Sequence, residues 1–134
     1  MIKTREEIRE AWLQELEEYP ERQIEGHLGS KFPDGTEKYC CLGQLCKITI
    51  SEENTEYKTG YSSEQDIYFK GHSLVLPVEV VNLVGLRSVG GDLKTPFSVK
   101  GKFYTSLSAM NDDAFTWPEI AAYIRANPEN VFVD

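Results

Sequence analysis

The chain has 134 residues, of which 40% are hydrophobic and 27% charged, and its formal net charge is −8. This length suits one domain that buries about two-thirds of its unfolded surface and needs no disulfide or metal to be stable. The negative charge argues against general nucleic-acid binding, which requires Lys and Arg to neutralise phosphates. No apolar run approaches the ~20 residues that cross a bilayer. We therefore expect a single domain over residues 1–134 and no contact with a membrane.

The N-terminal segment predicts an amphipathic helix. Thr4 and Glu7 have the spacing of a capping box, and Pro20 ends the segment. The opening MIKTREEIREAW is charged throughout and lacks the apolar stretch of a secretory signal. Together with an odd number of cysteines, this favours the cytoplasm. The apolar stripe of the helix consists of Ile8, Trp12, Leu16 and Tyr19.

A hairpin and a loop follow this helix. Pro33-Asp34-Gly35 is a turn signal, which places the arms of a hairpin near Leu28–Phe32 and Thr36–Cys40. Residues Cys41–Lys47 then predict a short helix, and Ile48–Ile50 a short strand. Residues 51–65 show no apolar periodicity and predict a long exposed loop.

The second half of the chain alternates short strands with short helices. Ile67–Phe69 and Ser73–Leu76 predict two strands, and a helix is expected between Pro77 and Gly85. Thr95–Val99 and Phe103–Thr105 predict another hairpin. A second capping box, formed by Thr116 and Glu119, starts a C-terminal helix that Asn127-Pro128 stops.

These elements predict an α+β fold, in which a small antiparallel sheet of short hairpins is packed by an N-terminal and a C-terminal amphipathic helix. We expect the apolar positions of both helices and of the cysteine-rich segment to meet in one core. The predicted core residues are Trp12, Leu16, Cys41, Leu45, Cys46, Leu83, Leu107, Ile120 and Ile124.

The cysteine segment, Tyr39–Cys46 or YCCLGQLC, holds every cysteine of the chain. Zinc needs four ligands at suitable spacing, and adjacent cysteines on a strand point to opposite faces, so we expect no metal. A cysteine enzyme would use Cys41 or Cys40, with His27 or His72 as the base. Free cysteine is more often a small buried hydrophobe, and we expect these thiols to be packing residues beside Gly43.

A basic segment, residues 87–102, stands out from the acidic chain. It contains four basic residues and one acid, a net charge of +3 against −8 for the whole chain. Paired glycines form anion-binding nests and aromatic rings stack on bases, so the segment predicts a site for a phosphorylated small molecule, although a solvated charge cluster is the simpler interpretation. The residues predicted to bind are Arg87, Gly90, Gly91, Lys94, Phe97, Lys100, Lys102 and Tyr104.

The order of several motifs resembles a family of small bacteriophage and prophage proteins of unknown function. The most specific pieces are YCCLGQLC and the Asn111-Asp112 pair before the Thr116–Ala121 helix start. The resemblance implies no catalytic residues. The other matching pieces are Trp12, Gln23, Gly26-His27-Leu28, Leu76-Pro77, Val80, Gly85-Leu86, Leu107 and Met110.

These observations lead to two functional hypotheses. The first is a non-catalytic phage accessory protein in the host cytoplasm that binds a host-side target, either a phosphorylated small molecule or a host protein. The second is a cysteine-dependent enzyme using Cys41 or Cys40 with a histidine. We expect no cofactor, and the sequence leaves open whether the chain forms a homo-oligomer.

Overall fold

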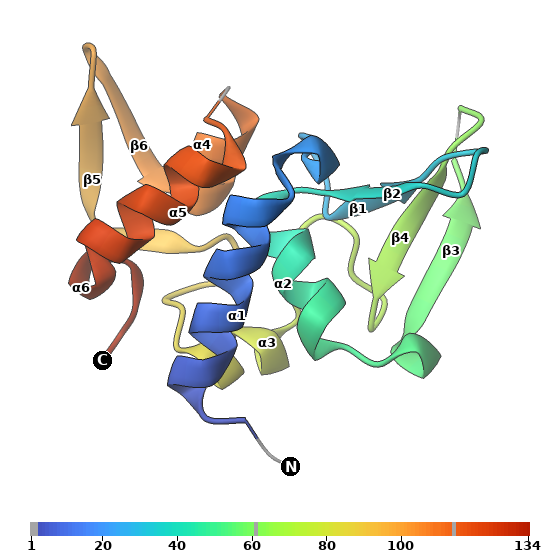
Figure 1. Ribbon diagram of the computed structural model, residues 1–134, viewed down its shortest axis with the longest axis horizontal. Helices are drawn as coiled ribbons and strands as arrows, with labels where there is room; N and C mark the ends of the chain where they lie inside the picture. The colour runs from blue at the N-terminus through green and yellow to red at the C-terminus, as the bar shows by residue number, and fades with distance from the viewer. Residues whose placement is uncertain (1–2, 61, 114) are drawn as a thin grey trace.

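A computed structural model describes residues 3–60, 62–113 and 115–134, and it confirms the α+β class. Helices α1 and α2 occupy the middle of the molecule (Figure 1). A four-stranded sheet lies to one side of them, and a separate hairpin with the C-terminal helices lies to the other. None of the helices in the described residues is both long and apolar enough to cross a membrane.

Helix α1 (Arg5–Glu18) begins with the expected capping box. The Thr4 hydroxyl accepts a hydrogen bond from the Glu7 amide at 3.1 Å, and the Glu7 carboxylate accepts one from the Thr4 amide at 2.8 Å. Pro20 ends the helix and opens a short 3₁₀ turn, η1 (Pro20–Arg22). The buried face of α1 consists of Ile8, Trp12, Leu13 and Leu16.

The sheet is built from two antiparallel hairpins. Strands β1 (Gly29–Lys31) and β2 (Glu37–Tyr39) form the predicted first hairpin, and β3 (Thr55–Thr59) pairs with β4 (Gln65–Phe69). Because β1 also pairs with β4, the strand order is β2-β1-β4-β3. Strand β3 therefore lies at one border of the sheet, as Figure 1 shows.

The prediction of a long loop over residues 51–65 is wrong. Most of its described residues are exposed, but the stretch contains a 3₁₀ turn, η2 (Glu52–Asn54), all of β3 and the first residue of β4. Tyr61 lies outside the described residues. The sequence of β3, TEYKT, has no apolar alternation because neither of its faces is buried in the core. Main-chain pairing with β4 holds these residues as a strand. Such pairing leaves no trace in the hydrophobic pattern of the sequence, and the strand was therefore missed.

Two other strand predictions are wrong, and one helix is confirmed. Helix α2 (Cys41–Thr49) continues through the segment expected to be a strand, with the Ile50 amide still bonded to the Cys46 carbonyl at 2.8 Å. Residues 73–76 form no strand. Helix α3 (Val78–Val84) ends at Gly85, whose φ of 78° is the left-handed conformation that glycine favours.

The part of the chain after α3 carries a third hairpin and, among the described residues, three helices. Strands β5 (Asp92–Val99) and β6 (Lys102–Ser106) pair as predicted, and α4 (Leu107–Asp112) follows directly. Helix α5 (Trp117–Ala126) starts with the second capping box, and α6 (Pro128–Val131) closes the chain.

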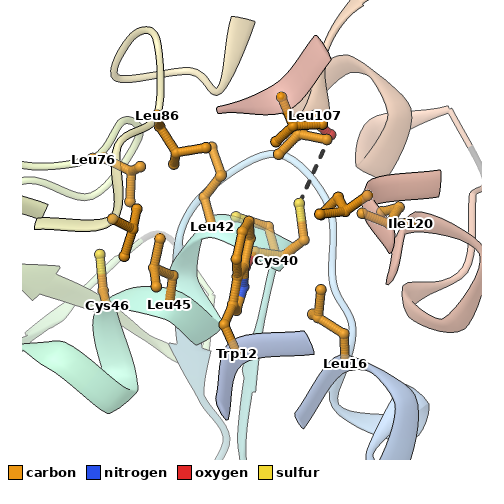
Figure 2. Packing of buried hydrophobic residues seen from close by; sticks show 14 of the residues in the cluster. Trp12, Leu16, Cys40, Leu42, Leu45, Cys46, Leu76, Leu86, Leu107 and Ile120 are labelled. Atoms are coloured by element: carbon orange, nitrogen blue, oxygen red, sulfur yellow. Dashed lines mark hydrogen bonds between the residues drawn. The ribbon is translucent and has the colours of Figure 1, made fainter. Parts of the chain in front are cut away.

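One core joins these elements around α1 and α2 (Figure 2). The indole of Trp12 is fully buried and donates a hydrogen bond to the Cys41 carbonyl at 2.8 Å. Eight of the nine predicted core residues are buried, and Leu83, 43% exposed, is the exception. Since α3 turns Val80, Val81 and Val84 inward, Leu83 falls on the opposite side of this short helix.

Candidate functional site

The cysteine segment lies at the centre of the core. All three cysteines are free and buried, and Cys41 and Cys46 have no exposed surface, which confirms their prediction as packing residues. Cys40 caps helix α2, its sulfur accepting a hydrogen bond from the Gly43 amide at 3.3 Å. The Cys41 sulfur lies 3.8 Å from the Leu107 carbonyl oxygen, the contact dashed in Figure 2.

Burial makes these thiols poor nucleophiles. It raises the pKa of Cys40 to about 11, and it also raises the pKa of Cys41 and of Cys46 above the ordinary thiol value. A nucleophilic cysteine needs a lowered pKa, because the thiolate is the reactive form. The environment of all three thiols acts in the opposite direction.

The two histidines make their contacts elsewhere. His27 Nε2 lies 2.5 Å from the Ser30 hydroxyl and 3.8 Å from an Asp66 carboxylate oxygen, so its ring is placed against the sheet. His72 is exposed in the turn that follows β4. The contacts of His27 and the exposure of His72 therefore give no thiol–imidazole pair of the kind that a cysteine enzyme requires.

Asn111 is the polar hub of this core. It is fully buried, and its Oδ1 accepts hydrogen bonds from the Cys41 amide at 3.0 Å and from the Gln23 side chain at 3.1 Å. Its Nδ2 donates to the Ile24 carbonyl at 2.8 Å. The Asn111 side chain thus links the end of α4 to the start of α2 and to the chain after η1. Its role in this structure is to stabilise the fold.

The basic segment is the predicted ligand site, and its arginine is engaged inside the molecule. Arg87 donates hydrogen bonds to the Glu129 carbonyl at 3.2 Å and to the Phe132 carbonyl at 3.0 Å. These bonds hold the C-terminal residues against the strand-like stretch at Leu86. The guanidinium therefore serves the fold in this structure.

The two glycines are also engaged. The Gly90 amide donates to the Ser88 hydroxyl at 3.3 Å, and the Gly91 amide donates to the Ser88 carbonyl at 3.1 Å. An anion nest needs free amides that converge on one point. Here Ser88 accepts from both, which leaves this turn without the donors that a phosphate would use.

The aromatic residues of the segment pack inward. The Phe97 ring lies 4.5 Å from the Tyr123 ring, and the Tyr104 ring lies 4.9 Å from the Phe115 ring, as measured between centroids. The Tyr104 hydroxyl donates to Asp113 at 2.6 Å, which together with Lys102 at 3.3 Å lowers the pKa of that carboxyl group. Tyr104 is buried and Phe97 is half-buried, so neither ring is an exposed platform for stacking on a base.

Several side chains of the β5–β6 hairpin do face solvent. Lys94 and Lys100 are exposed, and Phe103 is 74% exposed, the largest value among the large hydrophobic residues that the structure describes. Phe103 was not among the predicted site residues. The signal was present, because β6 alternates along Lys102–Ser106 and a buried Tyr104 turns its neighbour Phe103 outward.

Two surface cavities lie beside the four-stranded sheet, away from the β5–β6 hairpin. Cavities of about 740 Å³ and 620 Å³ flank β2 and share Glu37, Tyr39 and Lys47. The Glu37 carboxylate accepts hydrogen bonds from the hydroxyls of Tyr39 and Tyr57 and lies 3.7 Å from the Lys47 amine. None of the eight predicted ligand-binding residues lines either cavity.

This cluster offers hydrogen bonds but no activated nucleophile. Burial, and then the Glu37 carboxylate, raise the pKa of Tyr39 and of Tyr57, so both remain phenols that donate to Glu37. The pattern of Glu37 and Tyr39 two positions apart on one strand face was the available sequence signal. Among residues 3–60, 62–113 and 115–134, no three His, Cys, Asp or Glu side chains are grouped as a metal site.

Comparison with known proteins gives one match. The model of a domain family of unknown function matches residues 4–128, almost the whole chain. No curated protein and no solved structure matches the chain.

Proposed function

The chain belongs to this family of unknown function, DUF8296, so no activity can be taken from its relatives, and we propose that it is a non-catalytic protein that binds another protein. The contact surface is the solvent face of the β5–β6 hairpin, formed by Lys94, Lys100 and Phe103. The partner presents an acidic surface with an apolar depression that accepts the phenyl ring.

The exposure of Phe103 carries this proposal. A phenyl ring that is 74% exposed leaves a large apolar area in water, and aromatic residues are enriched in protein interfaces. Lys94 and Lys100 lie on the same hairpin as Phe103, in a chain whose overall charge is −8. A local positive charge of this kind attracts and orients an acidic partner.

A phosphorylated small molecule is less well supported as the target. The Arg87 guanidinium, the Gly90 and Gly91 amides and the Tyr104 hydroxyl are all bonded within the chain. Small-molecule sites are concave, whereas Phe103 and the two lysines stand on an exposed hairpin. The hairpin therefore suits a broad contact with a protein better than it suits a nucleotide.

The state of the thiols supports a role without catalysis. The alternative enzyme depends on Cys41 or Cys40, and both are buried with a raised pKa. The resemblance to small phage proteins adds the biological setting of the proposal, in which the chain is a phage accessory protein and its partner is a protein of the bacterial host cytoplasm.

The proposal is tested by affinity capture from a bacterial lysate with wild-type protein, Phe103→Ala and Lys94→Glu/Lys100→Glu. Leu74→Ala is the matched control, because Leu74 is also an exposed apolar residue, at 68%, but lies outside the hairpin. We expect a protein that is retained by wild type and control and lost by both hairpin variants. Its affinity, remeasured with purified components, should fall about tenfold or more with Phe103→Ala and weaken with added salt.

Two results would overturn it. In the first, wild type and hairpin variants retain the same proteins with equal affinity. In the second, calorimetry with cyclic dinucleotides or ADP-ribose derivatives shows binding that Lys100→Glu abolishes, which would make the hairpin a small-molecule site.

A further inference from the structure

The outer edge of β3 is an open strand edge. Among the described residues β3 pairs only with β4, and it is the last strand in the order β2-β1-β4-β3. Figure 1 shows no element beyond it. Open edges present unpaired main-chain groups that another strand can bond, and proteins usually shield them.

The ladder with β4 shows which groups are open. The Lys70 amide donates to the Asn54 carbonyl, and in the antiparallel pattern this turns the main-chain groups of Glu56 and Lys58 toward β4. Those of Thr55, Tyr57 and Thr59 therefore point outward. The Thr55 amide is bonded to the Glu52 carbonyl, which leaves its carbonyl oxygen and both groups of Tyr57 and Thr59 available.

The sequence of β3 is complementary to itself in the antiparallel direction. When TEYKT runs against a second TEYKT centred on Tyr57, threonine faces threonine, tyrosine faces tyrosine, and Glu56 faces Lys58 of the second copy. By symmetry Lys58 faces the other Glu56. Opposite charges on facing strand positions stabilise a pair, and like charges destabilise it.

We propose that two copies of this chain associate through β3, edge to edge and antiparallel, about a two-fold axis at Tyr57. The two four-stranded sheets then become one continuous sheet. Such an isologous contact is the usual geometry of a homodimer. A second copy fits this edge better than an unrelated strand does, because its charges are complementary at both charged positions.

The hydrogen bonds follow the same register. The outward groups of Tyr57 form a bonded pair with those of Tyr57 in the second copy, and each Thr59 amide donates to the opposite Thr55 carbonyl. Glu56 and Lys58 then occupy the unbonded positions, where facing Cα atoms are closest and side chains interact most strongly. The register that satisfies the open main-chain groups is thus the same register that places Glu56 opposite Lys58.

A charge-swap series tests the proposal. Sedimentation equilibrium over a range of concentrations would compare wild type, Glu56→Lys, Lys58→Glu and Glu56→Lys/Lys58→Glu. Each single change places like charges opposite one another twice, and we expect the dimer dissociation constant to rise about tenfold or more. The double variant restores both opposite pairs and should return to near the wild-type value. Lys3→Glu, at an exposed lysine that precedes α1 and lies outside the sheet, makes the same charge change as Lys58→Glu and should leave association unchanged.

Amide hydrogen exchange measures directly whether the outer edge of β3 is covered in the dimer. The Tyr57 and Thr59 amides should exchange more slowly as the protein concentration rises, while the exchange rates of the Glu56 and Lys58 amides, which already face β4, should not change.

The inference is overturned if wild type keeps the mass of one chain up to millimolar concentration, if a single charge reversal associates as tightly as wild type, or if the folded double variant fails to recover wild-type association. Protection of Tyr57 that is independent of concentration would count against it equally.

Discussion

The cysteine segment and the basic segment each concentrate chemically notable side chains in a short stretch, and the structure uses them differently. In Tyr39–Cys46 the side chains of Cys40, Cys41 and Cys46 are buried, and the helix they belong to is packed on several sides. In residues 87–102 the arginine, the glycine amides and Phe97 are engaged within the chain, while Lys94 and Lys100 remain in water. Residue type alone therefore does not identify a site, because partners distant in sequence decide which groups are free.

The first way to test this contrast is thiol labelling. Since all three thiols are buried, we expect alkylation by iodoacetamide to require unfolding of the core. The native protein should react about 10³-fold or more slowly than the protein in urea. Rapid labelling of a native thiol at neutral pH would reassign the cysteine segment to the surface.

The next largest effect is expected from Gly43→Ala. A Cβ atom at Gly43 would lie 1.7 Å from the Leu28 carbonyl oxygen, so helix α2 or the β1 hairpin must move. Alanine favours helix by about 1 kcal/mol, but the clash should lower the free energy of unfolding by about 3 kcal/mol or more. Urea denaturation measures this, with Gly60→Ala as control, because a Cβ there meets only ordinary contacts. Equal stability of the two variants would contradict the close packing.

Removing the polar hub should cost somewhat less. Asn111→Ala leaves the buried Cys41 amide without its acceptor and the Ile24 carbonyl without its donor. We expect the free energy of unfolding to fall by about 2–3 kcal/mol. Asn54→Ala, at an exposed asparagine, is the matched control and should change stability by less than about 0.5 kcal/mol. A loss at Asn111 as small as that at Asn54 would show that the hub is dispensable.

A gain in stability is expected at Gln44. Its side chain is fully buried in α2, and neither Nε2 nor Oε1 has a hydrogen-bond partner among the described residues. Methionine has a similar shape and no such requirement, so Gln44→Met should raise the free energy of unfolding by about 1 kcal/mol. A decrease of that size would mean that the amide is satisfied in solution.

The smallest effect concerns the ion pairs between α1 and α5. Arg125 bonds both Glu10 and Glu17, which lowers the pKa of each carboxyl group. The stabilisation is therefore present above the ordinary glutamate pKa, about 4.3, and is lost as the pH falls through the lowered values. Arg125→Gln should cost about 0.5–1 kcal/mol at pH 7 and progressively less in acid. Lys94→Gln, an exposed position on β5, is the control, and a cost at Arg125 that does not depend on pH would contradict this account.

The sequence predicted much of the fold because several signals were local. Both capping boxes, the Pro33-Asp34-Gly35 turn and the glycine after α3 act within a few residues, and each is present in the structure. Strand β3 was missed because its evidence is a main-chain ladder with β4. Leu83 was placed in the core because its hydrophobicity was visible and the orientation of a seven-residue helix was not.

The candidate site was less accessible for the same reason. Nothing local to Arg87 indicates that its guanidinium bonds the carbonyls of Glu129 and Phe132, which follow more than forty positions later. Phe103, by contrast, was open to prediction from strand alternation once Tyr104 was assigned inward. Site prediction from one sequence thus fails where an internal partner is distant and succeeds where a strand period is enough.

The packing of α1 has a consequence for synthesis on the ribosome. Helix α1 is made before α5, and Arg125, which bonds Glu10, lies 115 positions beyond it, so the interface with α5 closes only after those positions have been synthesised. At roughly 5–20 residues per second, the part of α1 that packs on α5 stays uncovered for about 6–23 seconds. During that interval the nascent chain is a natural client for ribosome-associated chaperones.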